Sequence, residues 1–237
     1  MHALILAGGE GSRLRADGVT TPKPFLELAG RPLLLRLVDT LGRLGCETIT
    51  AVLRDTLLDP TLTARLADAP LPLRVVRCAT PSSLHSLSQG LERVPPGPVL
   101  CSMVDTVMRE QDWRQVFAQG DRCLTTGADA CVAVTPFVAD ERPLYVLRHA
   151  GGGVAAFQND PVRPALVTGG VYFLSSRVRS LAPRVLAQGI ARMRGFLRWL
   201  VEHGYNVETA EVERIVDLDR GSDLLAAAAW LGAGAVP

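Results

Sequence analysis

Three glycines and two cations near the N-terminus are the residues whose types and spacing could do chemistry. An apolar run ends at Ala7, and the glycines stand within the next four positions. Because glycine has no Cβ, backbone N–H groups in such a loop can approach an anion closely. Arg13 follows the glycines directly, and Lys23 stands between two prolines that restrict its backbone. We therefore expect this segment to wrap a polyphosphate, and the loop residues expected to contact it are Leu6, Ala7, Gly8, Gly9 and Gly11.

The spacing of these residues excludes two common phosphate-binding loops. A P-loop needs Gly-Lys-Ser/Thr, whereas Gly11 is followed by Ser12 and Arg13. The dinucleotide-binding fingerprint needs a third glycine where this chain has Leu14. What stands here is LAGGEGSRL, then TPKPF, then GRPLL. This combination resembles the signature of the sugar-phosphate nucleotidyltransferases, which join an NTP to a sugar 1-phosphate and release pyrophosphate.

The resemblance implies roles for the loop and both cations. The loop residues would bind the nucleotide, Arg13 would orient the triphosphate and the leaving pyrophosphate, and Lys23 would contact the α-phosphate and the incoming phosphate. A guanidinium suits the first task because its planar fork matches phosphate oxygens. A phosphate monoester is already ionised at neutral pH, so catalysis would consist of positioning and charge neutralisation with a metal. The alternative for both residues is a solvated surface cation.

Acidic residues in two places are candidate ligands of that metal, which we expect to be Mg²⁺. Asp105 follows an apolar run at residues 99–104, where the family has Gly-Asp and this chain has Val-Asp. Asp217 and Asp219 point the same way along an extended segment, because side chains alternate with period two. Carboxylate oxygens are hard ligands that suit Mg²⁺. We expect Asp105 to be one ligand and prefer Asp217 over Asp219 as the second; for Asp105 the alternative is a helix cap.

Further residues are candidates for holding the base and the acceptor. Ser82 and Ser83 stand where the family recognises the base, although either could instead cap a helix. Gly170 lies in a segment that resembles the turn beneath the sugar ring. The family's Glu-Lys-Pro, whose lysine binds the sugar phosphate, is Asn-Asp-Pro at residues 159–161 here. Arg192 and Arg194 could replace that lysine, since arginines and helix N-termini both favour phosphate; the alternative is a solvated basic face.

Alternating apolar strands and helices must position these residues. The pattern predicts strands at 3–7, 48–53, 73–78 and 98–103, with helices at 32–44, 57–67 and 83–93. Such alternation is typical of an α/β fold, a Rossmann-like three-layer sandwich with a mainly parallel mixed sheet. Ligands of these sheets bind outside the carboxyl ends of the strands, where the glycine loop and Asp105 would meet.

The sequence pattern changes in the second half of the chain. Short alternating runs between turn residues at about 143–174 predict a small antiparallel substrate subsheet. Helices are predicted at 176–187 and 192–203, then a strand at 207–212 and a helix from 222. We expect residues 1–237 to form a single nucleotidyltransferase domain.

Composition limits the classes of partner. Of 237 residues 48% are hydrophobic and 21% charged, and the net charge is +1, so nothing indicates a general field for nucleic acid or an acidic membrane. The apolar stretch at 224–236 is too short to span a bilayer, and the N-terminus lacks a signal-peptide pattern. Five scattered cysteines are typical of reduced thiols. We expect a cytoplasmic protein that binds an NTP and a phosphorylated small molecule but neither nucleic acid nor membrane, and the sequence leaves a homo-oligomer open.

Two other functions fit parts of the sequence. The missing lysine favours a non-sugar acceptor, as in cytidylyltransferases for phosphocholine or phosphonates, and molybdenum-cofactor enzymes share the opening motif. A catalytically silent nucleotide-binding homologue is the third reading, which the retained cations and acids disfavour. Neither the base nor the acceptor can be identified from the residues.

Overall fold

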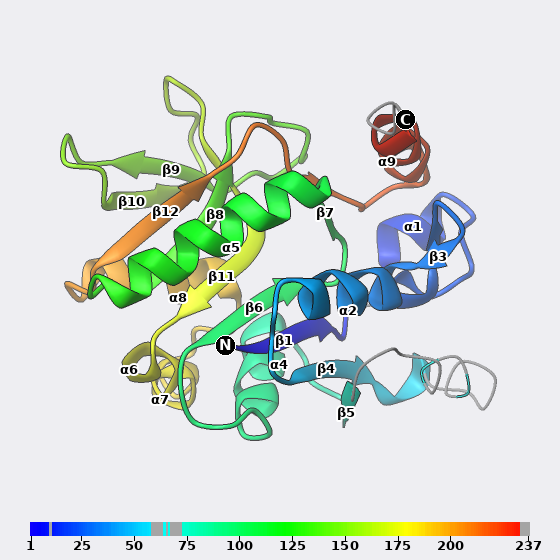
Figure 1. Ribbon diagram of the computed structural model, residues 1–237, viewed down its shortest axis with the longest axis horizontal. Coiled ribbons are helices and arrows are strands. Elements are labelled where there is room, and N and C mark those ends of the chain that lie inside the picture. Colours follow the sequence, from blue (N-terminus) through cyan, green and yellow to red (C-terminus); the bar gives the residue numbers. More distant parts are fainter. Residues whose placement is uncertain (10, 58–63, 65, 67–72, 233–237) are drawn as a thin grey trace.

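The computed structural model describes residues 1–9, 11–57, 64, 66 and 73–232, and its centre is a large mixed sheet (Figure 1). In the described residues the sheet has nine strands: β10-β9-β11-β6-β1-β4-β5 follow in that order, and β8 pairs with both β11 and β12. Its strands are β1 (His2–Ala7), β4 (Ile49–Arg54), β5 (Leu73–Cys78), β6 (Val99–Met103), β8 (Ala130–Thr135), β9 (Tyr145–Arg148), β10 (Val154–Gln158), β11 (Val167–Leu174) and β12 (Val207–Glu211).

Helices cover both faces of this sheet, which gives the expected three-layer α/β sandwich. Figure 1 shows α2 and α5 in front of the sheet and α4, α7 and α8 behind it. The α-helices are α1 (Ser12–Ala16), α2 (Leu33–Arg43), α4 (Ser83–Leu91), α5 (Glu110–Thr125), α6 (Ser176–Arg179), α7 (Ala182–Leu186), α8 (Met193–Glu202) and α9 (Gly221–Gly232). No helix in these described parts combines the length and apolar character that a membrane span requires.

The central strand β1 shows why its residues form a buried parallel strand. It pairs in parallel with β4 and β6, and its residues from Ala3 to Ala7 are all buried. Its side chains alternate between the two faces, so Ile5 joins the apolar cluster under α2 and α5 while Leu4 and Leu6 join the cluster under α4, α7 and α8. A continuous apolar run is required because both faces are covered.

The predicted elements agree with the described ones at most positions; strand β8 was not predicted, and three helical segments differ from the prediction. The helix predicted over 57–67 lies largely outside the described residues. The helix predicted over 176–187 is divided into α6 and α7, and Pro183 stands in the first turn of α7, where it cannot donate the backbone bond that a continuous helix needs. Between residues 104 and 142, where no helix was predicted, the structure has α5.

Residues 143–174 were predicted to form a small separate subsheet, but their strands belong to the main sheet. Strands β9 and β10 form an antiparallel pair. Strand β11 is antiparallel too, but it lies inside the main sheet, where it pairs with β6 and β8. The main sheet is therefore mixed.

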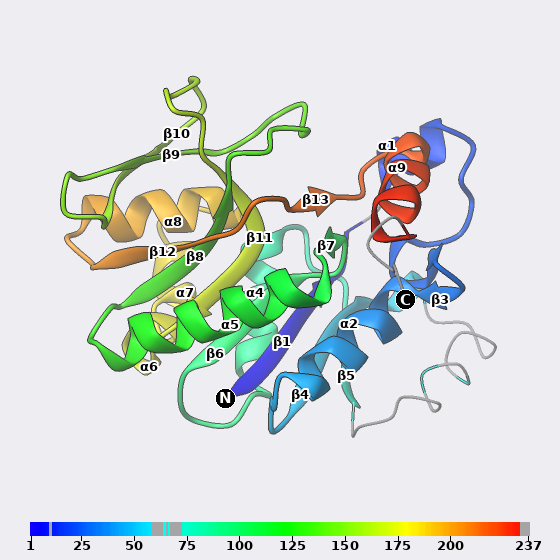
Figure 2. The same cartoon turned by 45° about the horizontal axis from the view of Figure 1, so that its top comes forward.

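Two short antiparallel pairs complete the fold and place the acidic segment. Strands β2 (Glu27–Leu28) and β3 (Arg31–Pro32) pair with each other, and β7 (Thr106–Val107) pairs with β13 (Val216–Asp217). In the second pair Asp217 lies opposite Thr106, which is next to Asp105 in the chain. The chain then enters α9, which lies beside α1 (Figure 2). Backbone N–H of Gly221 donates to the Asp17 carboxylate across this contact.

Candidate functional site

The predicted nucleotide residues meet at the carboxyl ends of β1 and β6. A cavity of about 330 Å³ lies there, and its lining includes Leu6, Gly8, Gly9, Ser82 and Ser83. Ala7 is buried in β1 and does not line the cavity. Space beside Gly8 is limited, because a Cβ at this position would lie 3.3 Å from Ser86 Oγ. The structure thus brings the predicted loop and the predicted serines to one cavity.

Gly11 has a different place at the end of the loop. It precedes α1 with a φ of +61°, a left-handed conformation that favours glycine. A Cβ added there would lie 3.8 Å from Lys23 Cβ. Gly11 therefore turns the chain into α1 next to the lysine, and it does not line the cavity itself.

The two predicted cations are joined to two of the predicted acids. Lys23 Nζ donates to Asp105 Oδ2 at 2.7 Å and to Asp219 Oδ1 at 2.8 Å. The second oxygen of Asp219 accepts from an Arg13 guanidinium N–H at 2.6 Å. Asp219 thus bridges both cations, a contact that the sequence did not predict; the preference for Asp217 concerned the metal and stays a prediction. Both cations are partnered within the fold, so neither is a freely solvated surface residue.

These contacts set the charges of the network. Burial opposes the charge of Lys23, but the carboxylates of Asp105 and Asp219 outweigh it and raise the lysine pKa above its ordinary value. Burial would raise the pKa of Asp219, yet the adjacent Lys23 and Arg13 lower it. Lys23 and Asp219 therefore stay charged at neutral pH.

Asp217 lies in a less favourable place. Burial, followed by the charges of Asp105, Asp140 and Asp219, raises its pKa well above the ordinary value, and Lys23 opposes this only in part. Its one side-chain donor in the described residues is the Thr106 hydroxyl, at 3.3 Å. A bound cation would relieve this repulsion.

The donor set fits a metal that shares its coordination with a substrate. In the described residues no three His, Cys, Asp or Glu side chains form a ready metal cluster, and Lys23 holds Asp105 and Asp219. Mg²⁺ in nucleotide enzymes is commonly bound by one or two carboxylates, with waters and phosphates completing its shell. Asp105 and Asp217 are the pair that would supply those carboxylates.

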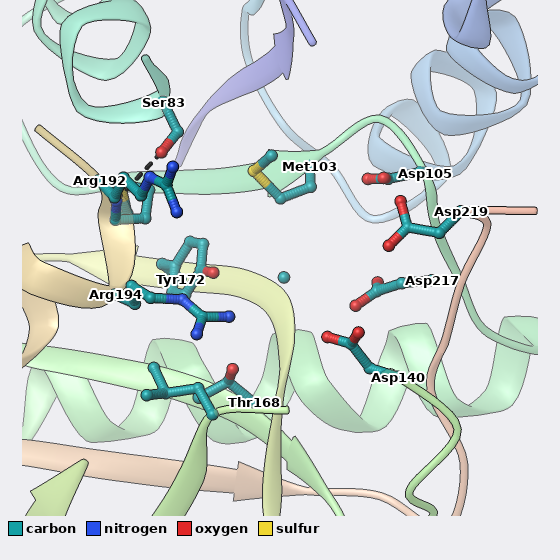
Figure 3. A pocket seen from close by; sticks show the side chains of 13 residues that line it. Ser83, Met103, Asp105, Asp140, Thr168, Tyr172, Arg192, Arg194, Asp217 and Asp219 are labelled. Atoms are coloured by element: carbon teal, nitrogen blue, oxygen red, sulfur yellow. Dashed lines mark hydrogen bonds between the residues drawn. The ribbon is translucent and has the colours of Figure 1, made fainter. Parts of the chain in front are cut away.

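A second cavity, of about 200 Å³, adjoins the first (Figure 3). One of its walls carries four carboxylates, and the opposite wall carries hydrogen-bond donors from β11 and the start of α8. The lining includes the carboxylates of Asp105, Asp140, Asp217 and Asp219 and the donors of Thr168, Tyr172, Arg192 and Arg194. Ser83 and Met103 line both cavities, so the two spaces meet at these residues.

Gly170 provides close backbone approach beneath this second cavity. Its φ is +72°, and a Cβ would lie 2.4 Å from the Thr106 hydroxyl. The same hydroxyl donates to the carbonyl of Gly169 at 3.2 Å. The glycine therefore lets β11 pass against the segment that carries Asp105.

The two serines do not cap α4, whose start has no side-chain cap; both line the first cavity, and Ser83 lines the second as well. The Ser82 hydroxyl donates to the carbonyl of Ala191. The Ser83 hydroxyl accepts from the N–H of Met193 at 3.1 Å. They thus fasten the loop that carries Arg192, a role that was not predicted from the sequence, and the base contact stays a prediction.

The altered Asn-Asp-Pro stretch supplies no cation and lines neither cavity. Arg198 holds it, donating to the Asn159 side chain at 2.6 Å and to the Phe157 carbonyl at 3.0 Å. Arg192 and Arg194 do line the second cavity, as their place at the start of α8 indicates.

Several lining residues were not singled out from the sequence, among them Arg54, Tyr172 and Asp140. Arg54 ends β4 at the ligand edge and donates to the carbonyl of Gly8 at 3.1 Å; its place directly after a strand was a usable signal. Tyr172 could have been found from the alternation of β11. Asp140 lies between β8 and β9, where no periodic pattern indicates the direction of a side chain.

Part of the chain is similar to curated guanylyltransferases. The mannose-1-phosphate guanylyltransferase catalytic subunit beta of Drosophila melanogaster is 47% identical over 48 residues, which is 20% of this chain and 13% of that protein. The Danio rerio subunit of the same name is 49% identical over 49 residues, or 21% of this chain and 14% of the relative. The chain therefore matches only a small part of the length of these relatives.

Solved structures share the whole fold. The inositol-1-phosphate CTP transferase from T. maritima matches with a TM-score of 0.80 and 18% identity, over 100% of this chain and 98% of that one. A putative glucose-1-phosphate thymidylyltransferase from Bacillus anthracis, solved with sucrose, matches with a TM-score of 0.78 and 18% identity, over 98% and 95% of the two chains. The family model of the MobA-like NTP transferase domain matches residues 3–203. Since that match covers most of the chain and includes the glycine loop, both cations and Asp105, the chain belongs to the family of MobA-like NTP transferase domains.

Proposed function

We propose that this protein transfers a nucleoside monophosphate from an NTP to a phosphorylated small molecule of the sugar-phosphate class and releases pyrophosphate. The observation that carries this proposal is the meeting of two cavities at Ser83 and Met103, with the Lys23 network at their edge. One cavity contains the glycine loop, and the other opposes arginines to carboxylates. This arrangement suits a nucleotide and a second anion that react with each other.

The reaction needs little activation of the nucleophile. An acceptor phosphate oxygen is already ionised, so it can attack the α-phosphate in line while pyrophosphate departs from the opposite side. Arg13 and Lys23 neutralise the charge of the phosphates, and in doing so they exchange Asp219 for phosphate oxygens as partners. The bonds to Asp219 keep both cations ordered before the substrate arrives.

A metal belongs to the same proposal. Asp105 and Asp217 would hold Mg²⁺, which when bound supplies charge neutralisation between the reacting phosphates. The side chains of Arg192 and Arg194 would bind the acceptor phosphate in place of the family's lysine. The relatives and structural neighbours are named for mannose, inositol and glucose phosphates, so these compounds are the first acceptors to test.

The test is a matrix of the four NTPs against hexose 1-phosphates, inositol 1-phosphate and phosphocholine, with product mass and pyrophosphate as readouts. We expect one pair to react in the presence of Mg²⁺ and Lys23→Ala to abolish the reaction. Arg122→Ala, on the exposed side of α5, removes one positive charge away from both cavities and serves as the matched control. Binding of an NTP without turnover of any pair would contradict the proposal and favour a silent homologue.

A further inference from the structure

Asp140 is a carboxylate of the second cavity to which no role has yet been given. It lies in the segment between β8 and β9 and faces Asp217 on the carboxylate wall (Figure 3). Its Oδ1 accepts from the backbone N–H of Arg142 at 2.9 Å. Among the described residues no cation forms an ion pair with it, so its other oxygen is open to whatever enters the cavity.

The neighbours of Asp140 hold its segment in place from both sides. Glu141 forms an ion pair with Arg220 at 2.6 Å, and its other oxygen lies 3.9 Å from Arg13. The carbonyl of Arg142 accepts from Arg194 at 2.9 Å. Asp140 is therefore presented to the cavity by anchors on the nucleotide side and on the acceptor side.

Tyr172 gives an independent sign of a ligand on the opposite wall. The residue is only 6% exposed, and its hydroxyl points into the space between the two walls (Figure 3). Within the described part of the chain this hydroxyl has no hydrogen-bond partner. The ring is thus buried while the hydroxyl is left to the cavity, which provides room for a polar ligand group at this place.

The chemistry of these two groups selects one kind of acceptor. Asp140 is exposed at the cavity mouth, and its carboxylate accepts hydrogen bonds, so an acceptor that contacts it has to offer donors. Hydroxyl groups can donate to the carboxylate and also accept from the Tyr172 hydroxyl. A quaternary ammonium group would instead favour an aromatic cage, whereas Tyr172 is the one aromatic side chain among the described lining residues.

We propose that Asp140 is a specificity-determining residue that accepts hydrogen bonds from the hydroxyls of a polyhydroxylated acceptor phosphate, with the Tyr172 hydroxyl contacting the same acceptor from the opposite wall. This inference rests on the proposed function and deepens it. In this arrangement Arg192 and Arg194 bind the phosphate of the acceptor, and Asp140 binds its hydroxyl groups. Acceptors without hydroxyls near the phosphate are thereby disfavoured.

The test compares Asp140→Asn and Tyr172→Phe with the wild-type chain. The amide oxygen of asparagine can still accept from Arg142 N–H, so the local turn is kept while the charge is removed. We expect the KM and Kd for a hexose 1-phosphate or inositol 1-phosphate to rise about tenfold or more, with unchanged binding of NTP. Asp121→Asn, an exposed position on α5, is the matched control and should leave all values unchanged.

Several outcomes would overturn the inference. They are an unchanged acceptor KM in Asp140→Asn, a loss confined to kcat, a higher Mg²⁺ requirement at unchanged acceptor KM, and a wild-type preference for phosphocholine over the sugar phosphates. If no pair releases pyrophosphate, the proposed function fails, and the same acceptors are then measured by calorimetric binding. Weaker binding of the hydroxylated phosphates by Asp140→Asn would support the role of Asp140, whereas equal binding, or none by the wild type at millimolar concentration, would contradict it.

Discussion

Lys23→Met tests the ion-pair network most directly, because Lys23 is the single lysine of the chain. Methionine keeps most of the side-chain volume and removes only the charge and its hydrogen bonds. The lysine side chain is 10% exposed and that of Asp105 is 15% exposed, so this pair is nearly buried. Removing one partner of a buried pair costs about 3–5 kcal/mol.

The magnitude expected here is smaller, for a structural reason. The Asp219 side chain is 35% exposed and keeps its bond to Arg13, so water and the arginine compensate it in part. We therefore expect a loss of about 2–4 kcal/mol in the free energy of unfolding at pH 7, carried mainly by Asp105.

The loss should depend on pH with a definite sign. A lysine whose pKa is raised by folding adds stability that is fully present below its unfolded pKa of about 10.4. That contribution is lost only when the pH rises through the higher folded value. Asp219, whose pKa is lowered, adds stability above its unfolded pKa that is lost as the pH falls through its folded value. The difference between Lys23→Met and the wild type should therefore be constant from pH 7 to about pH 10 and should shrink in acid, below about pH 4.

Urea unfolding of the two proteins at pH 3.5, 7 and 9 measures this difference, and Arg122→Met is the control for loss of an exposed cation. Pyrophosphate release should fall at least a hundredfold in Lys23→Met and remain unchanged in the control. A stability loss below about 0.5 kcal/mol at pH 7 would refute this account of the network.

Four further predictions follow from single contacts. Asp217→Asn should raise the melting temperature by a few degrees at pH 7, because it removes a carboxylate whose raised pKa makes its ionised form costly. It should also abolish pyrophosphate release. The stabilisation should vanish in acid, where native Asp217 is protonated, and a lower melting temperature at pH 7 would contradict this prediction. Gly170→Ala should cost about 1–3 kcal/mol in urea unfolding, because its φ of +72° and the nearby Thr106 hydroxyl oppose a Cβ; a neutral effect would show that β11 can move. Ser83→Ala should raise the acceptor KM several-fold through the loop that it holds, and a change confined to the NTP KM would instead make Ser83 a nucleotide contact. EDTA should abolish pyrophosphate release, with recovery on adding Mg²⁺, yet leave the melting temperature unchanged because Lys23 already pairs two of the acids; a metal-independent rate would remove Mg²⁺ from the proposal.

The fold was predictable to the extent that its signals are local. Strand β1 is a continuous apolar run and α2 carries leucines at helical spacing, so their patterns are visible within a few residues. The membership of β11 was not predictable in this way. An antiparallel strand of a small subsheet and one inside the main sheet have the same alternation, and only pairing with β6 and β8 distinguishes them.

The candidate site likewise has a part that local sequence predicts and a part that depends on tertiary structure. The residue types and spacing of the glycine loop, Arg13 and Lys23 by themselves predicted a phosphate-binding segment, because a strand followed by glycines and cations is contiguous in the sequence. Which acid pairs with those cations was decided by the tertiary structure: Asp219 lies 206 residues from Arg13, and α9 must pack beside α1 before the two can meet. The opposition of Asp140 to Tyr172 is of the same kind, since side chains from separate segments share a cavity only through the packing of the whole sheet.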